Sequence, residues 1–80
     1  MRFMATIETG EDVRKEIWWH EGTHYLYSYT KDTLRDKFEE VMVFECDSSG
    51  NVTDWNELFV INGYEEASVT MGNFMQSIRV

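Results

Sequence analysis

The spacing of apolar residues changes once along the chain, and this change limits the possible folds more than any other feature. In residues 2–8 (RFMATIE), apolar and polar residues alternate, which is typical of a strand with one buried face. Residues 13–20, 23–30, 39–46 and 55–61 also have the alternation, or the apolar and aromatic content, of strands. From residue 65, apolar residues recur at helical spacing instead. The sequence therefore predicts an α+β fold, an antiparallel sheet of four to five strands with one C-terminal helix packed on one face.

Alternation also assigns the faces of the predicted strands. One face carries Phe3, Ala5 and Ile7 in residues 2–8, and Tyr25, Tyr27 and Tyr29 in residues 23–30. In residues 39–46 the pair Val41 and Val43 opposes Met42 and Phe44, as expected for a central strand covered on both sides. Trp18 and Trp19 fall on opposite faces if residues 13–20 are a strand, so one is predicted to be core and the other a surface contact. A helix is the alternative for this segment.

The predicted helix has one apolar stripe. The stripe consists of Ala67, Met71, Phe74, Met75 and Ile78, at spacings i, i+4, i+7, i+8 and i+11. Glu65 and Glu66 are placed in the first turn, where the positive end of the helix dipole favours acids, with Asn62 or Gly63 as N-cap. Residues 10–12 and 47–51 are predicted turns, and residues 31–37 are a loop or a single helical turn.

The length and composition indicate one globular domain over residues 1–80. A chain of this length buries only about 60–65% of its unfolded surface, and its 42% hydrophobic and 15% aromatic content is suited to an efficient core. Cys46 is the single cysteine, so no intrachain disulfide is possible and a reducing compartment is expected. No segment has the apolar length of a signal peptide or a membrane span. The expected location is cytoplasmic, with no membrane contact.

The net charge of −8 is distributed unevenly. Residues 38–78 contain eight Asp and Glu and no Lys or Arg. Direct nucleic-acid binding is disfavoured, because affinity for phosphates depends on clustered basic residues. A basic partner protein is favoured instead, including one that itself binds nucleic acid. The acids expected to project together as a partner-binding surface are those in turns and at the helix start, namely Asp47, Asp54, Glu57, Glu65 and Glu66.

Residues 20–24 spell His-Glu-Gly-Thr-His, the H-E-x-x-H pattern of zinc peptidases. A zinc site requires His20 and His24 one helical turn apart, with Glu21 polarising the bound water and a third ligand from elsewhere. Gly22 costs a helix about 0.8–1 kcal/mol relative to Ala, and Glu-Gly between two alternating segments is typical of a hairpin turn. The sequence favours the hairpin, with no metal or other cofactor and no catalytic residues.

Several features of the second half occur in a fixed order: a strand at residues 39–44, an acidic turn before GNVTDW at residues 50–55, the Glu57-Leu58 strand, and a helix opening with residues 65–67. In this order residues 38–78 resemble a group of short bacteriophage proteins that have an ETMVF-like strand, although Val41 stands where threonine is expected. A glycine-histidine associated with their helix is Gly72-Asn73 here, so no role for that histidine carries over. The resemblance implies a phage origin and no catalytic residue.

Three functions from different classes are compatible with these features. The first, which we favour, is a small acidic phage-encoded protein that binds and inhibits a host protein through an acidic, nucleic-acid-mimicking surface. The second is a structural or assembly module of a phage, for which a homodimer is one form. The third is the H-E-x-x-H zinc hydrolase. We predict that the protein is not an enzyme.

Overall fold

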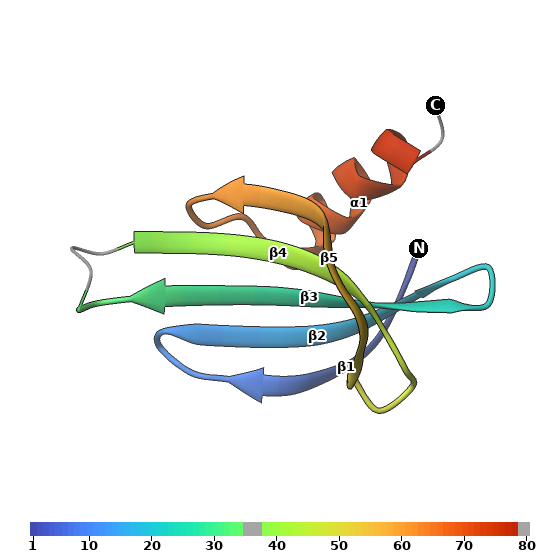
Figure 1. The fold of residues 1–80 in the computed structure, drawn as a ribbon, viewed down its shortest axis with the longest axis horizontal. Coiled ribbons are helices and arrows are strands. Elements are labelled where there is room, and N and C mark those ends of the chain that lie inside the picture. Colours follow the sequence, from blue (N-terminus) through green and yellow to red (C-terminus); the bar gives the residue numbers. More distant parts are fainter. Residues whose placement is uncertain (35–37, 79–80) are drawn as a thin grey trace.

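The computed structural model describes residues 1–34 and 38–78, which form one five-stranded antiparallel sheet and one helix (Figure 1). The strands are β1 (Arg2–Thr9), β2 (Val13–His20), β3 (Thr23–Asp32), β4 (Phe38–Cys46) and β5 (Val52–Asn62), and they lie in the sheet in chain order. The helix α1 (Ala67–Ile78) follows β5 and packs on one face. The predicted α+β fold is confirmed. Of the polar segment 31–37, the first two residues belong to β3, and residues 35–37 lie outside the described residues.

The main core lies between α1 and the three central strands. Val41 and Val43 of β4 are fully buried there, as the alternation predicted. The face of β3 that carries the tyrosines also points to α1, where the ring centroids of Tyr25 and Phe74 are 5.2 Å apart. The ring centroids of Phe74 and of Phe59 on β5 are 6.0 Å apart. These two aromatic contacts, one edge-on and one tilted, together with the area they bury, hold a helix whose own residues have modest helix propensity.

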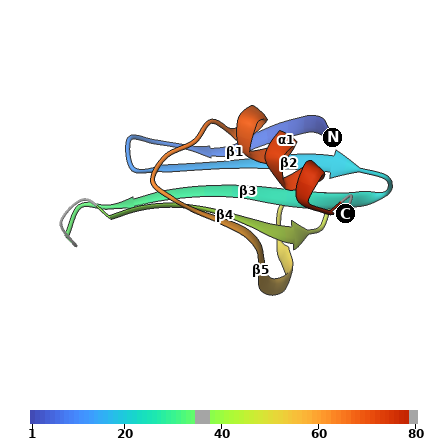
Figure 2. The ribbon, with the colours of Figure 1, turned by 90° about the horizontal axis from the view of Figure 1, so that it is seen from above.

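A second, smaller core lies on the opposite face of the sheet. Its buried members are Ile17, Leu26, Phe44 and Cys46. The first part of β5 crosses over this face, on the side of the sheet away from α1 (Figure 2). The turn before β5 packs there, since a methyl group added to Gly50 would lie 2.6 Å from Ile7 Cδ1 and 3.2 Å from Ile17 Cδ1. The chain therefore covers both faces of its sheet, one with a helix and one with its last hairpin.

The bend of β5 has a local cause in its pairing with β4. Between the pairs Val43–Phe59 and Glu45–Asp54, β5 has four residues where β4 has one. Extra residues on one strand break the ladder, bend the strand and increase its twist. Val52 and Asp54 still pair with Cys46 and Glu45 at the end of β4, and the bend carries this part of β5 over the face of the sheet (Figure 1).

The face predicted for β1 is wrong, although the strand itself is confirmed. Two register shifts interrupt the pairing of β1 with β2. Phe3 pairs with Trp18 and makes an edge-to-face contact with it on the helix side, with 5.5 Å between the ring centroids, whereas Ile7 contacts the Gly50 turn on the other side. Each extra residue reverses the alternation that follows it, so a strict period of two assigned these side chains to the same face incorrectly.

The helix begins later than the sequence predicted, and its stripe is shifted. The carbonyl of Glu66 accepts the Thr70 N–H at 2.9 Å, so Glu66 is the N-cap, and neither it nor Glu65 lies in the first turn. The Tyr27 hydroxyl donates to the Glu65 carbonyl at 2.5 Å and holds that residue in the loop. Thr70 is fully buried and donates to the Glu65 carboxylate at 3.0 Å. Four residues of the predicted stripe are buried, but Ile78 is 48% exposed.

Candidate interaction surface

The H-E-x-x-H segment is a β-hairpin, as predicted, and not a helix. Glu21 (φ 49°) and Gly22 (φ 84°) form a two-residue turn in which both residues have positive φ. His20 pairs with Thr23, and His24 pairs with Trp19, so the two imidazoles lie on opposite faces of the sheet. They cannot meet at one ion in this hairpin. Nowhere in residues 1–34 and 38–78 do three or more His, Cys, Asp or Glu side chains gather in a way suited to a metal ion.

The five predicted partner-binding acids form two groups. Asp47 lies in the turn between β4 and β5, and Asp54 and Glu57 lie in the first half of β5, on the side away from α1. Glu65 and Glu66 lie in the loop before α1, on the helix side. The predicted single surface is therefore divided by the sheet. The sequence predicted that these acids lie in turns and at the start of the helix. The path of β5 determines which of them are neighbours.

The group on the β5 side includes an aromatic residue that the sequence analysis did not single out. Trp55 lies between Asp54 and Glu57 and is 74% exposed. It makes an edge-to-face contact with Phe44, with 5.5 Å between the ring centroids. We call Asp47, Asp54, Trp55 and Glu57 the acidic β5 surface. Three of the four residues 54–57 are polar, which is unusual for a strand. This was the one feature of the sequence that could have indicated the irregular pairing of β5 here.

Two acids of the acidic β5 surface are held in place by their own turns. Asp47 accepts hydrogen bonds from the Ser49 and Asn51 N–H groups, both at 2.9 Å. The backbone and side-chain hydrogen bonds from Asn51 lower the pKa of Asp47 below its usual value, so it is ionised at neutral pH. Asp54 accepts the Asn56 N–H at 3.0 Å. Both carboxylates are thus oriented before any partner arrives.

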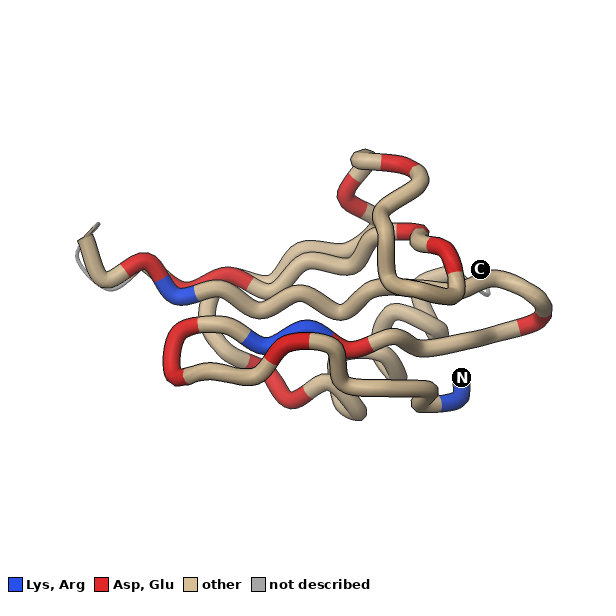
Figure 3. Tube along the Cα trace, turned by 90° about the horizontal axis from the view of Figure 1, so that it is seen from below, with Lys and Arg blue, Asp and Glu red and all other residues tan. Residues whose placement is uncertain are grey.

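No basic side chain neutralises this surface within the part of the chain that the structure describes. Figure 3 shows Asp and Glu around the turn and along the first half of β5, with Lys and Arg only on β1, β2 and β3. The two ion pairs to Lys or Arg among described residues are Arg14–Glu16 and Lys15–Glu8, both elsewhere. Glu57 makes no hydrogen bond or ion pair with another described residue. The acids of the acidic β5 surface therefore keep their charges available to a partner.

A groove adjoins the acidic β5 surface. It has a volume of about 490 Å³ and lies between the sheet and the crossing part of β5. Its apolar walls are Ile7, Leu26, Phe44, Val52 and Trp55, and its polar lining is Glu8, Lys15, Ser28 and Asn51. We call it the β5 groove.

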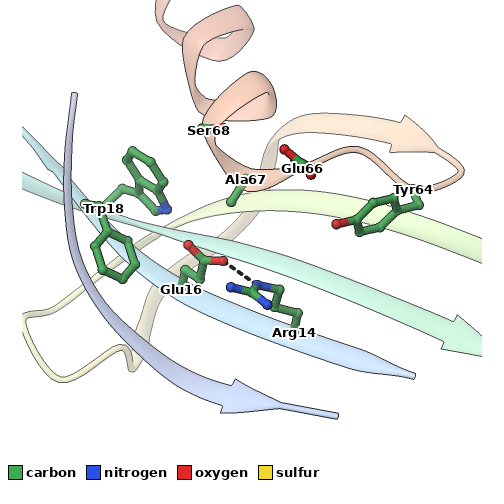
Figure 4. A pocket seen from close by; sticks show the side chains of 8 residues that line it. Arg14, Glu16, Trp18, Tyr64, Glu66, Ala67 and Ser68 are labelled. Atoms are coloured by element: carbon green, nitrogen blue, oxygen red, sulfur yellow. Dashed lines mark hydrogen bonds and ion pairs between the residues drawn. The ribbon is translucent and has the colours of Figure 1, made fainter. Parts of the chain in front are cut away.

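A separate cavity of about 410 Å³ lies on the helix side, between β2 and the start of α1 (Figure 4). Its central carboxylate, Glu16, is 4% exposed and accepts a hydrogen bond from Arg14 Nε at 2.5 Å. That bond and the charge of Glu16 raise the pKa of Arg14. Trp18 Nε1 is buried at its edge without a hydrogen-bond partner among the described residues. The Glu16 carboxylate is therefore committed to the ion pair with Arg14.

Cys46 offers no nucleophile at neutral pH. Its side chain is 5% exposed in the second core, and burial raises the pKa of the thiol to about 11. A protonated, inaccessible thiol is unreactive, because the thiolate is the nucleophile.

No protein-family model, curated protein or solved structure matches the chain. Among the residues that the structure describes, no helix combines the length and the apolar character that a membrane span requires.

Proposed function

We propose that the protein is a small phage-encoded inhibitor that binds a basic, nucleic-acid-binding protein of the host cytoplasm through the acidic β5 surface. The observation that carries the proposal is Trp55, which is 74% exposed between Asp54 and Glu57 in a stretch of chain, residues 38–78, that contains no Lys or Arg. Exposed tryptophan is enriched at interface hot spots. It also binds Lys and Arg through cation–π contacts, which adjacent carboxylates reinforce.

The physical basis is electrostatic steering followed by a short-range contact. The excess of negative charge attracts a basic surface over a distance set by the Debye length, about 8 Å at physiological salt. Exposed ion pairs contribute only about 0.2–1 kcal/mol each, so the acids mainly accelerate encounter and select a basic partner. The contact made by Trp55 supplies the specific part of the affinity. A partner that normally holds phosphates on the same basic surface would lose them on binding.

The second candidate, a phage assembly module, is favoured by one observation on β1. This edge strand exposes Phe3 (47%), Met4 (46%) and Ile7 (44%). An exposed apolar edge is suited to pairing with another chain, although the two register shifts in β1 oppose regular strand addition. Light scattering over a range of protein concentrations distinguishes the two functions, since an assembly module oligomerises without a host partner.

The test of the inhibitor function is displacement of host proteins from immobilised DNA. Host lysate is loaded on DNA-cellulose and eluted with wild-type protein, and the eluted protein is then purified for affinity measurements at low and high salt. We expect elution by the wild type and weaker binding as salt rises. The variant Asp54→Asn/Glu57→Lys raises the net charge by three and should not elute the partner, while Asn keeps a side-chain acceptor for the turn.

The matched control is Glu11→Lys/Asp12→Asn in the turn between β1 and β2. It changes the net charge equally, at a turn on the opposite end of the sheet (Figure 1). Circular dichroism confirms the fold of both variants. If both bind the partner as the wild type does, with unchanged salt dependence, the acidic β5 surface is not the binding site. If both lose binding equally, only net charge matters.

A further inference from the structure

The β5 groove lies directly beside the acidic β5 surface and shares Trp55 with it. We propose that the groove receives an apolar side chain of the partner, so that the recognised segment is an apolar residue flanked by Lys or Arg. This inference rests on the proposed function, and it adds the chemistry of the bound segment to it.

The lining of the groove favours an apolar guest. Leu26 and Phe44 form its floor and are 4% and 6% exposed, while the walls Ile7 and Trp55 are 44% and 74% exposed. A guest side chain would thus meet apolar atoms below and on both sides. The volume of about 490 Å³ lies within the range of about 300–1,000 Å³ typical of binding pockets. The one cation in the lining, Lys15, is 3.6 Å from Glu8 and is offset by it.

The charge at the rim determines which partner carries that side chain. Asp54 and Glu57 lie three positions apart on β5, the strand that forms one wall of the groove, and Trp55 lies between them in the sequence. A second copy of this chain is a poor occupant, because a symmetric dimer through this face would bring two acidic β5 surfaces together on chains of net charge −8. A basic segment instead pairs with the rim while its apolar residue enters the groove. The complementarity therefore points to a basic, amphipathic stretch of another protein.

Two synthetic peptides test the proposal by NMR titration of the ¹⁵N-labelled protein. One has a central phenylalanine flanked on each side by Lys-Arg-Lys, and the other has alanine at the centre. Burying the phenylalanine side chain should tighten binding by about tenfold or more relative to the alanine peptide. The amides of Leu26 and Ser28, which line the groove, should shift only with the phenylalanine peptide, whereas the Trp55 indole N–H should shift with both peptides, because Lys and Arg of the flanks also contact it.

A groove-filling variant, Ser28→Leu, supplies the control. Ser28 lines the groove, so a larger side chain there should abolish the advantage of phenylalanine while leaving the alanine peptide's binding unchanged. If Ser28→Leu does not fold, the comparison of the two peptides on the wild type still decides the question.

The remaining outcomes separate the two proposals. Equal binding of both peptides to the wild type, with salt dependence and with shifts confined to Asp54, Trp55 and Glu57, overturns the groove and leaves the inhibitor function intact. Absence of salt-dependent binding by either peptide removes the electrostatic basis of both. Shifts at Trp55 on concentrating the protein alone would assign the groove to a second copy and overturn the proposal.

Discussion

Replacement of Phe74 by alanine tests the packing of α1 quantitatively. Phe74 is 1% exposed and contacts the rings of Tyr25 and Phe59. Truncating a buried phenylalanine costs about 3–5 kcal/mol. At about 0.05–0.15 kcal/mol per residue, an 80-residue domain has about 4–12 kcal/mol of total stability. Phe74→Ala should therefore remove about a quarter or more of the free energy of unfolding, and in a marginally stable protein nearly all of it.

The matched control is Ile78→Ala, because helical spacing assigns both residues to one stripe and the structure does not. Ile78 is 48% exposed, so its truncation should cost about 1 kcal/mol or less. Ser77→Ala, at an exposed position, should change stability by less than about 0.5 kcal/mol. In urea, with m about 1 kcal/mol/M for a small domain, the midpoint should fall by several molar for Phe74→Ala and by about 1 M or less for Ile78→Ala. Equal midpoint shifts for the two variants would refute the packing of α1 described above.

Three further predictions concern the turns. In urea unfolding, Gly50→Ala should destabilise the protein more than Gly63→Ala. Both glycines have positive φ (89° and 107°), but an added methyl group meets other side chains only at Gly50. Equal losses of stability would mean that the last hairpin does not pack on β1 and β2. The pKa of Asp47 is lowered in the folded state, so its carboxylate stabilises the fold above about pH 4, and this stability is lost as the pH falls through the folded-state pKa. Asp47→Asn should therefore be less stable than the wild type at pH 7. A stability difference that persisted undiminished at pH 2 would contradict this prediction. Elemental analysis of protein purified without chelator should find no stoichiometric zinc, and one equivalent that is lost on replacing His20 or His24 would contradict the hairpin argument.

Local chemistry was enough to predict the strands, the helix and the hairpin at Glu21-Gly22. Strand alternation, helical spacing and turn residues act over a few neighbouring positions, and each is visible in the order of the residues. Val41 and Val43 are buried as the alternation predicted because β4 pairs regularly with β3 and has neighbours on both sides. The same reasoning failed on β1, where extra residues reverse the alternation and no residue type marks where they are inserted.

The candidate site depended on contacts between segments distant in the sequence. Composition alone identified the acidic, base-free half of the chain, since counting charges needs no coordinates. The irregular pairing of β4 with β5 bends residues 52–55 across the sheet and places Trp55 against Phe44 on the side away from α1, while Glu65 and Glu66 are left on the helix side. That bend also forms the β5 groove, whose walls come from β1, β3, β4 and β5. Such a surface depends on strand register and twist, which are properties of the whole sheet, so only the tertiary structure could determine it.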